Sequence, residues 1–183
     1  MDLWYPKADL SDKATADAGS FLGGYPKGIW HKTQGTSYSG ALATYKATKN
    51  WPNMTIGYDA SGKPTAWQHI AAGTAARALK NLTGGVETNR WNCFQIEIVG
   101  LADHPVPDDI CAILKDVSKW LEKDFGIPRT CSVTFLPAAH SGPARMSFSA
   151  WRLYSGWCGH QHVPENDHGD PGSPFPVGQI LSP

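Results

Sequence analysis

The sequence lacks the features of a membrane or nucleic-acid-binding protein. No stretch of its 183 residues approaches the roughly 20 consecutive apolar residues of a membrane helix. Its first ten residues, MDLWYPKADL, contain no apolar run of signal-peptide length. Lys and Arg number 16, as do Asp and Glu, so no basic excess favours a polyanionic partner. We therefore expect no membrane insertion and no nucleic-acid partner.

Cysteines are few and widely spread. The four are Cys93, Cys111, Cys131 and Cys158, and no two of them form a C-x-x-C pair. A zinc site made of four thiolates is therefore not indicated. The favoured interpretation is that they are small buried hydrophobic residues. One or two disulfides remain an alternative, because an even number of cysteines does not decide the matter.

The composition is that of a folded domain rich in loops. Hydrophobic residues make up 41% and charged residues 17% of the chain, with 19 Gly and 14 Pro. A chain of this length buries about two-thirds of the surface that it would expose when unfolded. This is enough for a stable core without disulfide bonds or structural metal ions. We find no internal repeat.

Periodicity in the first half predicts short elements joined by turns. Residues 1–27 are expected to be an irregular lead-in, followed by a strand at 28–31. Ser39 is a suitable N-cap for a helix at 39–50. Two β-rich runs around the turn at 60–64 predict a hairpin. A second short helix is expected at 75–81.

The second half contains the clearest strand and the clearest helix. In the strand CFQIEIVGL, Phe94, Ile96 and Ile98 point one way, which leaves Glu97 on the less apolar face. A helical repeat of apolar residues then starts near Pro107 and ends at Gly126. Further expectations are a strand at 131–136, a short helix at 147–154 and loop from Val163 onward. This irregular alternation predicts an α/β fold, a mixed sheet flanked by helices, with the site where loops leave the strand ends.

One loop concentrates groups that bind metals. Residues 159–172, GHQHVPENDHGDPG, hold three histidines and several carboxylates, and a catalytic zinc site needs about three such ligands. The loop could supply two of them and a distant histidine at a strand end the third. Asp170 precedes Pro171, which favours an extended conformation, and Gly172 allows a tight turn.

Three motifs in this order resemble a known family. GIWHKT, IEIVG and GH-x9-DPG are similar to those of the zinc-dependent N-acetylmuramoyl-L-alanine amidases of type 2, a family that includes the peptidoglycan recognition proteins. Residues 159–172 and the segment QHIAAGTAARALKN look most like the amidase domains of endolysins from phages of mycobacteria and related actinobacteria. The resemblance spans Gly28 to Pro176, so the expected catalytic domain is 28–176 and residues 177–183 are expected to be a tail or the start of a linker.

The resemblance implies roles for five residues. His31, His160 and Asp170 would hold one Zn²⁺, and Glu97 would accept a proton from water and pass it to the leaving nitrogen. His168 stands where many members carry a lysine that stabilises the oxyanion. Because imidazole titrates near pH ~6.5, activity is then expected to be sensitive to mildly acidic or neutral pH.

Other residues receive less specific interpretations. Pro52 and Asn53 replace an aromatic residue and a histidine that are frequent in the family, so substrate contacts at that wall are expected to differ. His162 is expected to be structural or to support a ligand, with metal binding as the alternative, and Cys158 also lies near the expected site. His69, His104 and His140 are interpreted as ordinary polar residues.

Three functions are compatible with these motifs. The first is hydrolysis of the bond between N-acetylmuramic acid and L-alanine in peptidoglycan, in the catalytic domain of a phage endolysin that lyses its host. The second is a peptidoglycan-binding module without catalysis, and the third is a zinc peptidase that cuts within the stem peptide. We expect a monomer that is made in the host cytoplasm, released to the wall by a holin-type lesion, and joined to further endolysin domains in the full-length protein.

Overall fold

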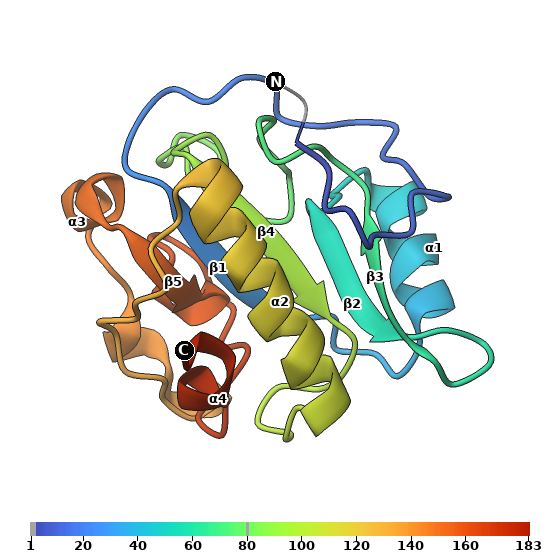
Figure 1. Cartoon of the computed structure of the whole chain (residues 1–183). Coiled ribbons are helices and arrows are strands. Elements are labelled where there is room, and N and C mark those ends of the chain that lie inside the picture. Colours follow the sequence, from blue (N-terminus) through green and yellow to red (C-terminus); the bar gives the residue numbers. More distant parts are fainter. Residues whose placement is uncertain (1–2, 80) are drawn as a thin grey trace.

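A mixed five-stranded sheet organises the protein (Figure 1). The computed structural model describes residues 3–79 and 81–183. The strands, in spatial order, are β3 (Pro64–Gln68), β2 (Met54–Tyr58), β4 (Cys93–Ile98), β1 (Lys27–Lys32) and β5 (Gly156–Gly159). Only the β2–β3 hairpin is antiparallel, and the other neighbours run parallel. The predicted fold class is therefore confirmed.

Four α-helices and three single-turn 3₁₀ helices complete the described fold. The α-helices are α1 (Tyr38–Thr48), α2 (Asp108–Phe125), α3 (Phe148–Leu153) and α4 (Val177–Leu181). The 3₁₀ helices are η1 (Ala138–His140), η2 (Gly142–Ala144) and η3 (His160–His162). Helix α2 crosses one face of the sheet, and α4 packs against α2 (Figure 1). None of the helices in the described residues is both long and apolar enough to cross a membrane.

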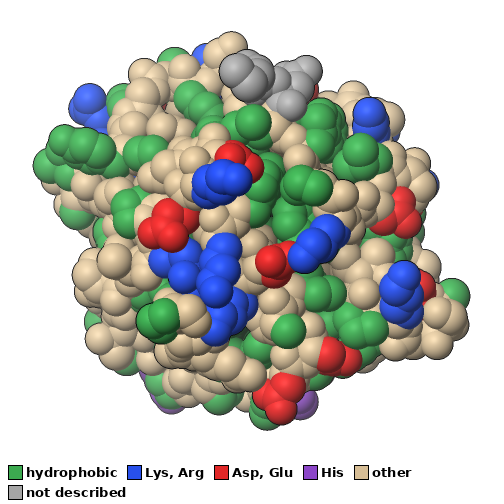
Figure 2. Space-filling view, viewed as in Figure 1, with side chains coloured by type: hydrophobic (Ala, Val, Ile, Leu, Met, Phe, Trp, Pro, Cys, Tyr) green, Lys and Arg blue, Asp and Glu red, His purple; other side chains and the backbone are tan. Residues whose placement is uncertain are grey.

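The main core lies between α2 and the sheet. Ile110, Leu114, Val117 and Leu121 follow one another at helical spacing and are buried with Phe94, Ile96 and Ile98 of β4. The helix ends at Gly126, whose φ of 78° is a left-handed conformation that glycine adopts without steric cost. Both predictions for this region are confirmed, although β4 ends at Ile98. Figure 2 views the α2 face, where basic and acidic side chains lie close to one another.

The sheet directs its polar residues to the opposite face. Side chains alternate along β2 and β4, so Thr55 and Glu97, which are partners in the register, point away from α2 and toward α1. Helix α1 packs its Ala41 and Tyr45 into a small cluster with Trp51 on this side. Its N-cap is Ser37 and not Ser39, because the Ser37 Oγ accepts the N–H of Gly40 at 3.2 Å.

The predicted helix at 75–81 is wrong. Residues 75–79 and 81 are not helical, and Lys80 lies outside the described residues. The backbone N–H groups that a helix would use are bound elsewhere: Ala78 N–H donates to Gln95 Oε1 at 2.9 Å and Leu79 N–H to Asn89 Oδ1 at 3.1 Å. These hydrogen bonds to the buried side chains of Gln95 and Asn89 thus outweigh the local helix propensity of the alanines.

The predicted strand at 131–136 is also wrong, and β5 was missed. The backbone of Leu136 bonds the side chain of Gln161 through both its N–H and its carbonyl, at 2.8 and 3.2 Å, so the segment is held by a side chain instead of a ladder. Strand β5 has four residues, two of them glycine, which gives no alternating pattern. Helix α4 likewise lies in the tail that was expected to be loop.

The segment before β1 has no helix or regular strand in residues 3–26, as predicted. It follows the sheet edge through single bridges, from Asp9 to Trp67 and from Gly19 to Ala75. Tyr5 from this segment and Ile180 from α4 are both buried in the main core. The domain boundaries at Gly28 and Pro176 remain predictions.

Gly28 is required by close packing in the centre of the sheet. A Cβ at this position would lie 2.3 Å from the ring of Trp157, which itself stacks on Trp30 with centroids 4.8 Å apart. We expect Gly28→Ala to lower the free energy of unfolding by about 1–3 kcal/mol through overpacking, as measured by chemical denaturation. The matched change Gly178→Ala, at a helical site with no atom within 4 Å, should be neutral or stabilising. Equal effects of the two changes would contradict the packing argument.

Candidate metal centre

Three buried side chains meet at the carboxyl end of the central strands. His31 comes from the end of β1, His160 directly follows β5, and Asp170 comes from the loop beyond. His31 Nδ1 and His160 Nδ1 are 3.0 Å apart, and His160 Nδ1 lies 3.3 Å from Asp170 Oδ1. One ligand atom from each residue lies within 4.8 Å of the others. The structure thus brings together the three residues predicted to be ligands.

This donor set can hold a metal ion. Four ligands placed tetrahedrally at the usual zinc distances of ~2.0–2.1 Å are about 3.3 Å from one another, close to the separations found here. Two neutral ring nitrogens at 3.0 Å also repel each other unless a proton or a cation lies between their lone pairs. Two imidazoles and a carboxylate are donors typical of zinc. The buried group of His31, His160 and Asp170 could therefore bind a metal.

Hydrogen bonds from two sides hold Asp170 in place. Its Oδ2 accepts the backbone N–H of Lys32 at 2.9 Å. The turn that follows is fixed by Asp103, whose carboxylate accepts the N–H of Ser173 and whose own N–H donates to Pro171 O, both at 3.1 Å. Gly172 has a φ of 90°, and a Cβ there would collide with Asp103. The predicted tight turn is present and immobilises the carboxylate.

Burial and neighbouring charges prepare the ligands for a cation. Burial raises the pKa of Asp170, but His160, His31 and the Lys32 N–H together hold it below its ordinary value, so the carboxylate is ionised at neutral pH. For His31, burial and then His160 lower the pKa well below its ordinary value. A neutral His31 offers its lone pair without first losing a proton.

Glu97 lies next to this group on the same face of the sheet. It is the register partner of His31 in the parallel β1–β4 pair, and its Oε1 is 3.7 Å from His31 Nδ1. Its Oε2 is buried with no hydrogen-bond partner among the described residues. Burial, and then the charge of Asp170, raise the pKa of Glu97 well above its ordinary value. A buried carboxyl group with a raised pKa is a candidate for general acid–base chemistry.

His168 borders the centre at its more exposed side. Its ring stacks on that of His160 with centroids 4.4 Å apart, and its Nδ1 is 3.8 Å from Asp170 Oδ1. His162 lies outside the metal group: its Nδ1 accepts the Gly159 N–H and its Nε2 contacts the Thr134 carbonyl, both at 3.0 Å. This arrangement is that of a structural residue. Cys158 is buried apart from the group, and the four cysteines are free thiols.

A groove of about 1110 Å³ leads to the centre. One wall is the face of α1 made by Gly40, Ala41, Thr44, Tyr45 and Thr48. The other is made by residues of the segment 77–90, and Glu97, His160, His168 and Asp170 line its base. The sequence assigned no binding role to any residue of either wall, although the segment QHIAAGTAARALKN at 68–81 overlaps the second wall. Asn53 takes no part in lining it, since its side chain is buried and bonds the backbone of Gln95 and Thr74.

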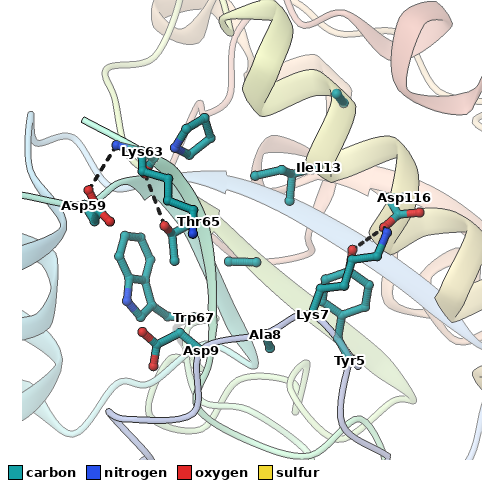
Figure 3. A pocket seen from close by; sticks show the side chains of 13 residues that line it. Tyr5, Lys7, Ala8, Asp9, Asp59, Lys63, Thr65, Trp67, Ile113 and Asp116 are labelled. Atoms are coloured by element: carbon teal, nitrogen blue, oxygen red, sulfur yellow. Dashed lines mark hydrogen bonds and ion pairs between the residues drawn. The ribbon is translucent and has the colours of Figure 1, made fainter. Parts of the chain in front are cut away.

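A second cavity of about 740 Å³ lies between β3, α2 and the lead-in segment (Figure 3). Lys7 and Tyr5 bond Asp116 across it, and Asp59 and Lys63 lie at its other end. None of its described lining residues is a histidine or cysteine. The groove that holds the metal group is therefore the better candidate for catalysis.

Comparisons with solved structures identify the fold. This chain is similar to the endolysin N-acetylmuramoyl-L-alanine amidase LysCS from Clostridium intestinale URNW, with a TM-score of 0.58 and 14% sequence identity. The match covers 97% of this chain and 94% of LysCS. Staphylococcus aureus hydrolase AmiA gives 0.57 at 14% identity, covering 98% of this chain and 82% of that one. The chain shares the fold of these proteins. Drosophila PGRP-LB matches at 0.53 and 12% identity, covering 93% and 86%.

The shared fold confirms the coarse part of the sequence resemblance. The neighbours include both amidases and a peptidoglycan recognition protein, as expected from the motifs. No protein-family model and no curated protein sequence matches the chain significantly. The more specific likeness to endolysins of mycobacterial phages remains a prediction.

If His31, His160 and Asp170 are the ligands, substitution of any one of them should weaken zinc binding. Purified protein should bind one Zn²⁺ per chain, and His160→Ala or Asp170→Ala should weaken binding by more than about 100-fold, since even loss of a supporting residue costs ~10–100-fold. Metal content and competition with a chromophoric chelator measure this. The exposed His104 is a matched control, and His104→Ala should bind like the wild type. Unchanged zinc affinity in both ligand variants would contradict the assignment.

Proposed function

We propose that this protein is a zinc-dependent N-acetylmuramoyl-L-alanine amidase. The observation that carries the proposal is the buried group of His31, His160 and Asp170 at the base of a groove, in a fold shared with such amidases. Glu97, whose pKa is raised, lies beside this group, with its Oε1 3.7 Å from His31 Nδ1. The substrate would be the amide bond between N-acetylmuramic acid and L-alanine in peptidoglycan.

His31, His160 and Asp170 would hold the ion, which when bound supplies an activated water and polarises a carbonyl. Glu97 takes the proton from the attacking water and delivers it to the departing nitrogen of L-alanine. Its buried Oε2 supports this role, because a carboxyl group without a fixed partner is available to the reactants. His168, beside His160 and Asp170, donates to the tetrahedral oxyanion in the role of the family's lysine.

The two alternatives have less support. A binding module does not need a complete ligand set with a proton-transfer group beside it, and here both are present. A peptidase that cuts within the stem peptide would use the same chemistry on another bond. The fold neighbours whose names state the bond that they hydrolyse are N-acetylmuramoyl-L-alanine amidases, which favours the amidase over the peptidase.

We also propose the biological setting that the motifs suggest. The chain would act on the bacterial wall as the catalytic part of an endolysin from a mycobacteriophage, reaching its substrate through a holin-type lesion. It would act as a monomer, with neighbouring domains in the full-length protein. The endolysin LysCS among the fold neighbours supports the general setting.

Product analysis tests the proposed bond specificity. Digestion of mycobacterial peptidoglycan should release muramic acid with a free lactyl carboxyl group together with stem peptides that begin with L-alanine, as identified by mass spectrometry. Glu97→Gln should lower kcat by about 100-fold or more with zinc content unchanged. Stem peptides cut internally would instead indicate a peptidase, and binding without any product a recognition module.

The role of His168 is tested separately. His168→Ala should lower kcat by roughly 100-fold, because an oxyanion donor is lost, while zinc binding stays within about threefold. His168→Lys should retain much of the activity, since lysine supplies the same kind of donor. His140→Ala, at an exposed histidine outside the groove, is the control. Full activity of His168→Ala would rule out the assignment.

A further inference from the structure

The loop that carries His168 is held from inside by one buried amide. Among residues 165–169 it is Asn166 whose side chain is buried, at 8% exposure, whereas His168 is exposed. Asn166 Nδ2 donates to the backbone carbonyl oxygen of His160 at 3.2 Å and to that of Val163. Asn166 Oδ1 accepts the backbone N–H of His168 at 2.7 Å. One side chain thus connects the backbone of a candidate metal ligand to that of the proposed oxyanion donor.

The three partners fix the orientation of this amide. Carbonyl oxygens only accept and a backbone N–H only donates, so the NH2 group faces His160 and Val163 while the oxygen faces His168. The opposite orientation would place the amide oxygen against two carbonyl oxygens and leave the buried donors without acceptors. Asn166 therefore has a single arrangement that satisfies all three contacts.

The backbone on the other side of His168 is held as well. Gly169 O accepts Gln161 Nε2 at 2.8 Å, and a Cβ on Gly169 would lie 2.2 Å from the carbonyl oxygen of Ala138. The His168 side chain is itself 48% exposed at the groove, and its ring stacks on His160 with an interplanar angle of 10°. With the backbone held on both sides, the position of this ring depends only on its own side-chain torsions.

We propose that Asn166 is a positioning residue for His168, which it holds beside the metal centre at a fixed place relative to His160. This inference rests on the proposed function, in which His168 donates to the tetrahedral oxyanion. A displacement of about 1 Å in a group that acts in the transition state can cost on the order of 100-fold in rate, so an exposed loop residue with this role needs a backbone anchor. A purely structural Asn166 would instead affect folding and leave kcat unchanged.

A double-mutant cycle tests whether Asn166 acts through His168. Asn166→Ala should lower kcat on a soluble muramoyl-L-alanine fragment by roughly 10- to 100-fold, with KM and zinc affinity within about threefold of the wild type. In the His168→Ala background the same change should lower kcat by less than about threefold, because the group that Asn166 positions is already absent. Equal losses of kcat in the two backgrounds would overturn the proposal.

Asn53 is a matched control for the loss of a buried amide. Its Nδ2 donates to the carbonyl oxygens of Ala71 and Thr74 at 3.4 and 3.0 Å, and its Oδ1 accepts the Gln95 N–H at 2.9 Å. Asn53→Ala therefore removes the same kinds of hydrogen bond at a site that does not line the groove. It should lower the midpoint of thermal unfolding but change kcat by less than about threefold. A loss of kcat as large as in Asn166→Ala would count against the proposal.

Amide hydrogen exchange of the wild-type protein tests the anchor without turnover and without a variant. The His168 N–H should exchange roughly 100-fold more slowly than in an unfolded chain, although the residue is exposed, because it is bonded to a buried oxygen. Exchange of this N–H at the rate of an unfolded chain would overturn the proposal even if Asn166→Ala did not fold.

Failure of the proposed function has a different signature. In that case the wild type leaves the fragment intact, or His168→Ala keeps the full kcat, and either result overturns the positioning role as well, since no catalytic group remains for Asn166 to position. Failure of the positioning role alone leaves the expected loss of kcat in His168→Ala and no loss in Asn166→Ala.

Discussion

The candidate site depends on the parallel alignment of β1 with β4 and β5. Parallel strands bring their carboxyl ends to one edge, so His31, Glu97 and His160 meet there although they are far apart in sequence. The register matters as much as the direction. A shift of one residue between β1 and β4 would turn Glu97 toward α2 and away from His31.

Burial then sets the chemistry of the residues that the sheet brings together. In a site shielded from water, charges interact strongly and charged forms are costly. The same environment keeps His31 neutral, raises the pKa of Glu97 and leaves Asp170 ionised because two histidines and a backbone N–H compensate its burial. Opposite shifts in neighbouring groups are what acid–base chemistry on a metal centre requires.

The lead-in segment and the loop after β5 complete the groove from outside the sheet. The carbonyl of Asp12 anchors His69, and through Thr55 this contact reaches Tyr45 on α1. On the other side Asp103 holds the turn behind Asp170. Irregular segments therefore position side chains here as effectively as helices and strands, because each is tied by buried hydrogen bonds to the sheet.

Periodicity in the sequence determined the strands around His31 and Glu97, helix α2 and the mixed fold class, because these signals are local. The three candidate ligands followed from the family resemblance of the motifs. The non-helical path of residues 75–79, the irregular path of 131–136 and the wall residue Tyr45 were decided only in the tertiary structure. For the two segments the deciding hydrogen bonds come from side chains elsewhere in the chain, namely Gln95, Asn89 and Gln161. Local propensity is worth less than ~1 kcal/mol per residue and cannot withstand such buried contacts.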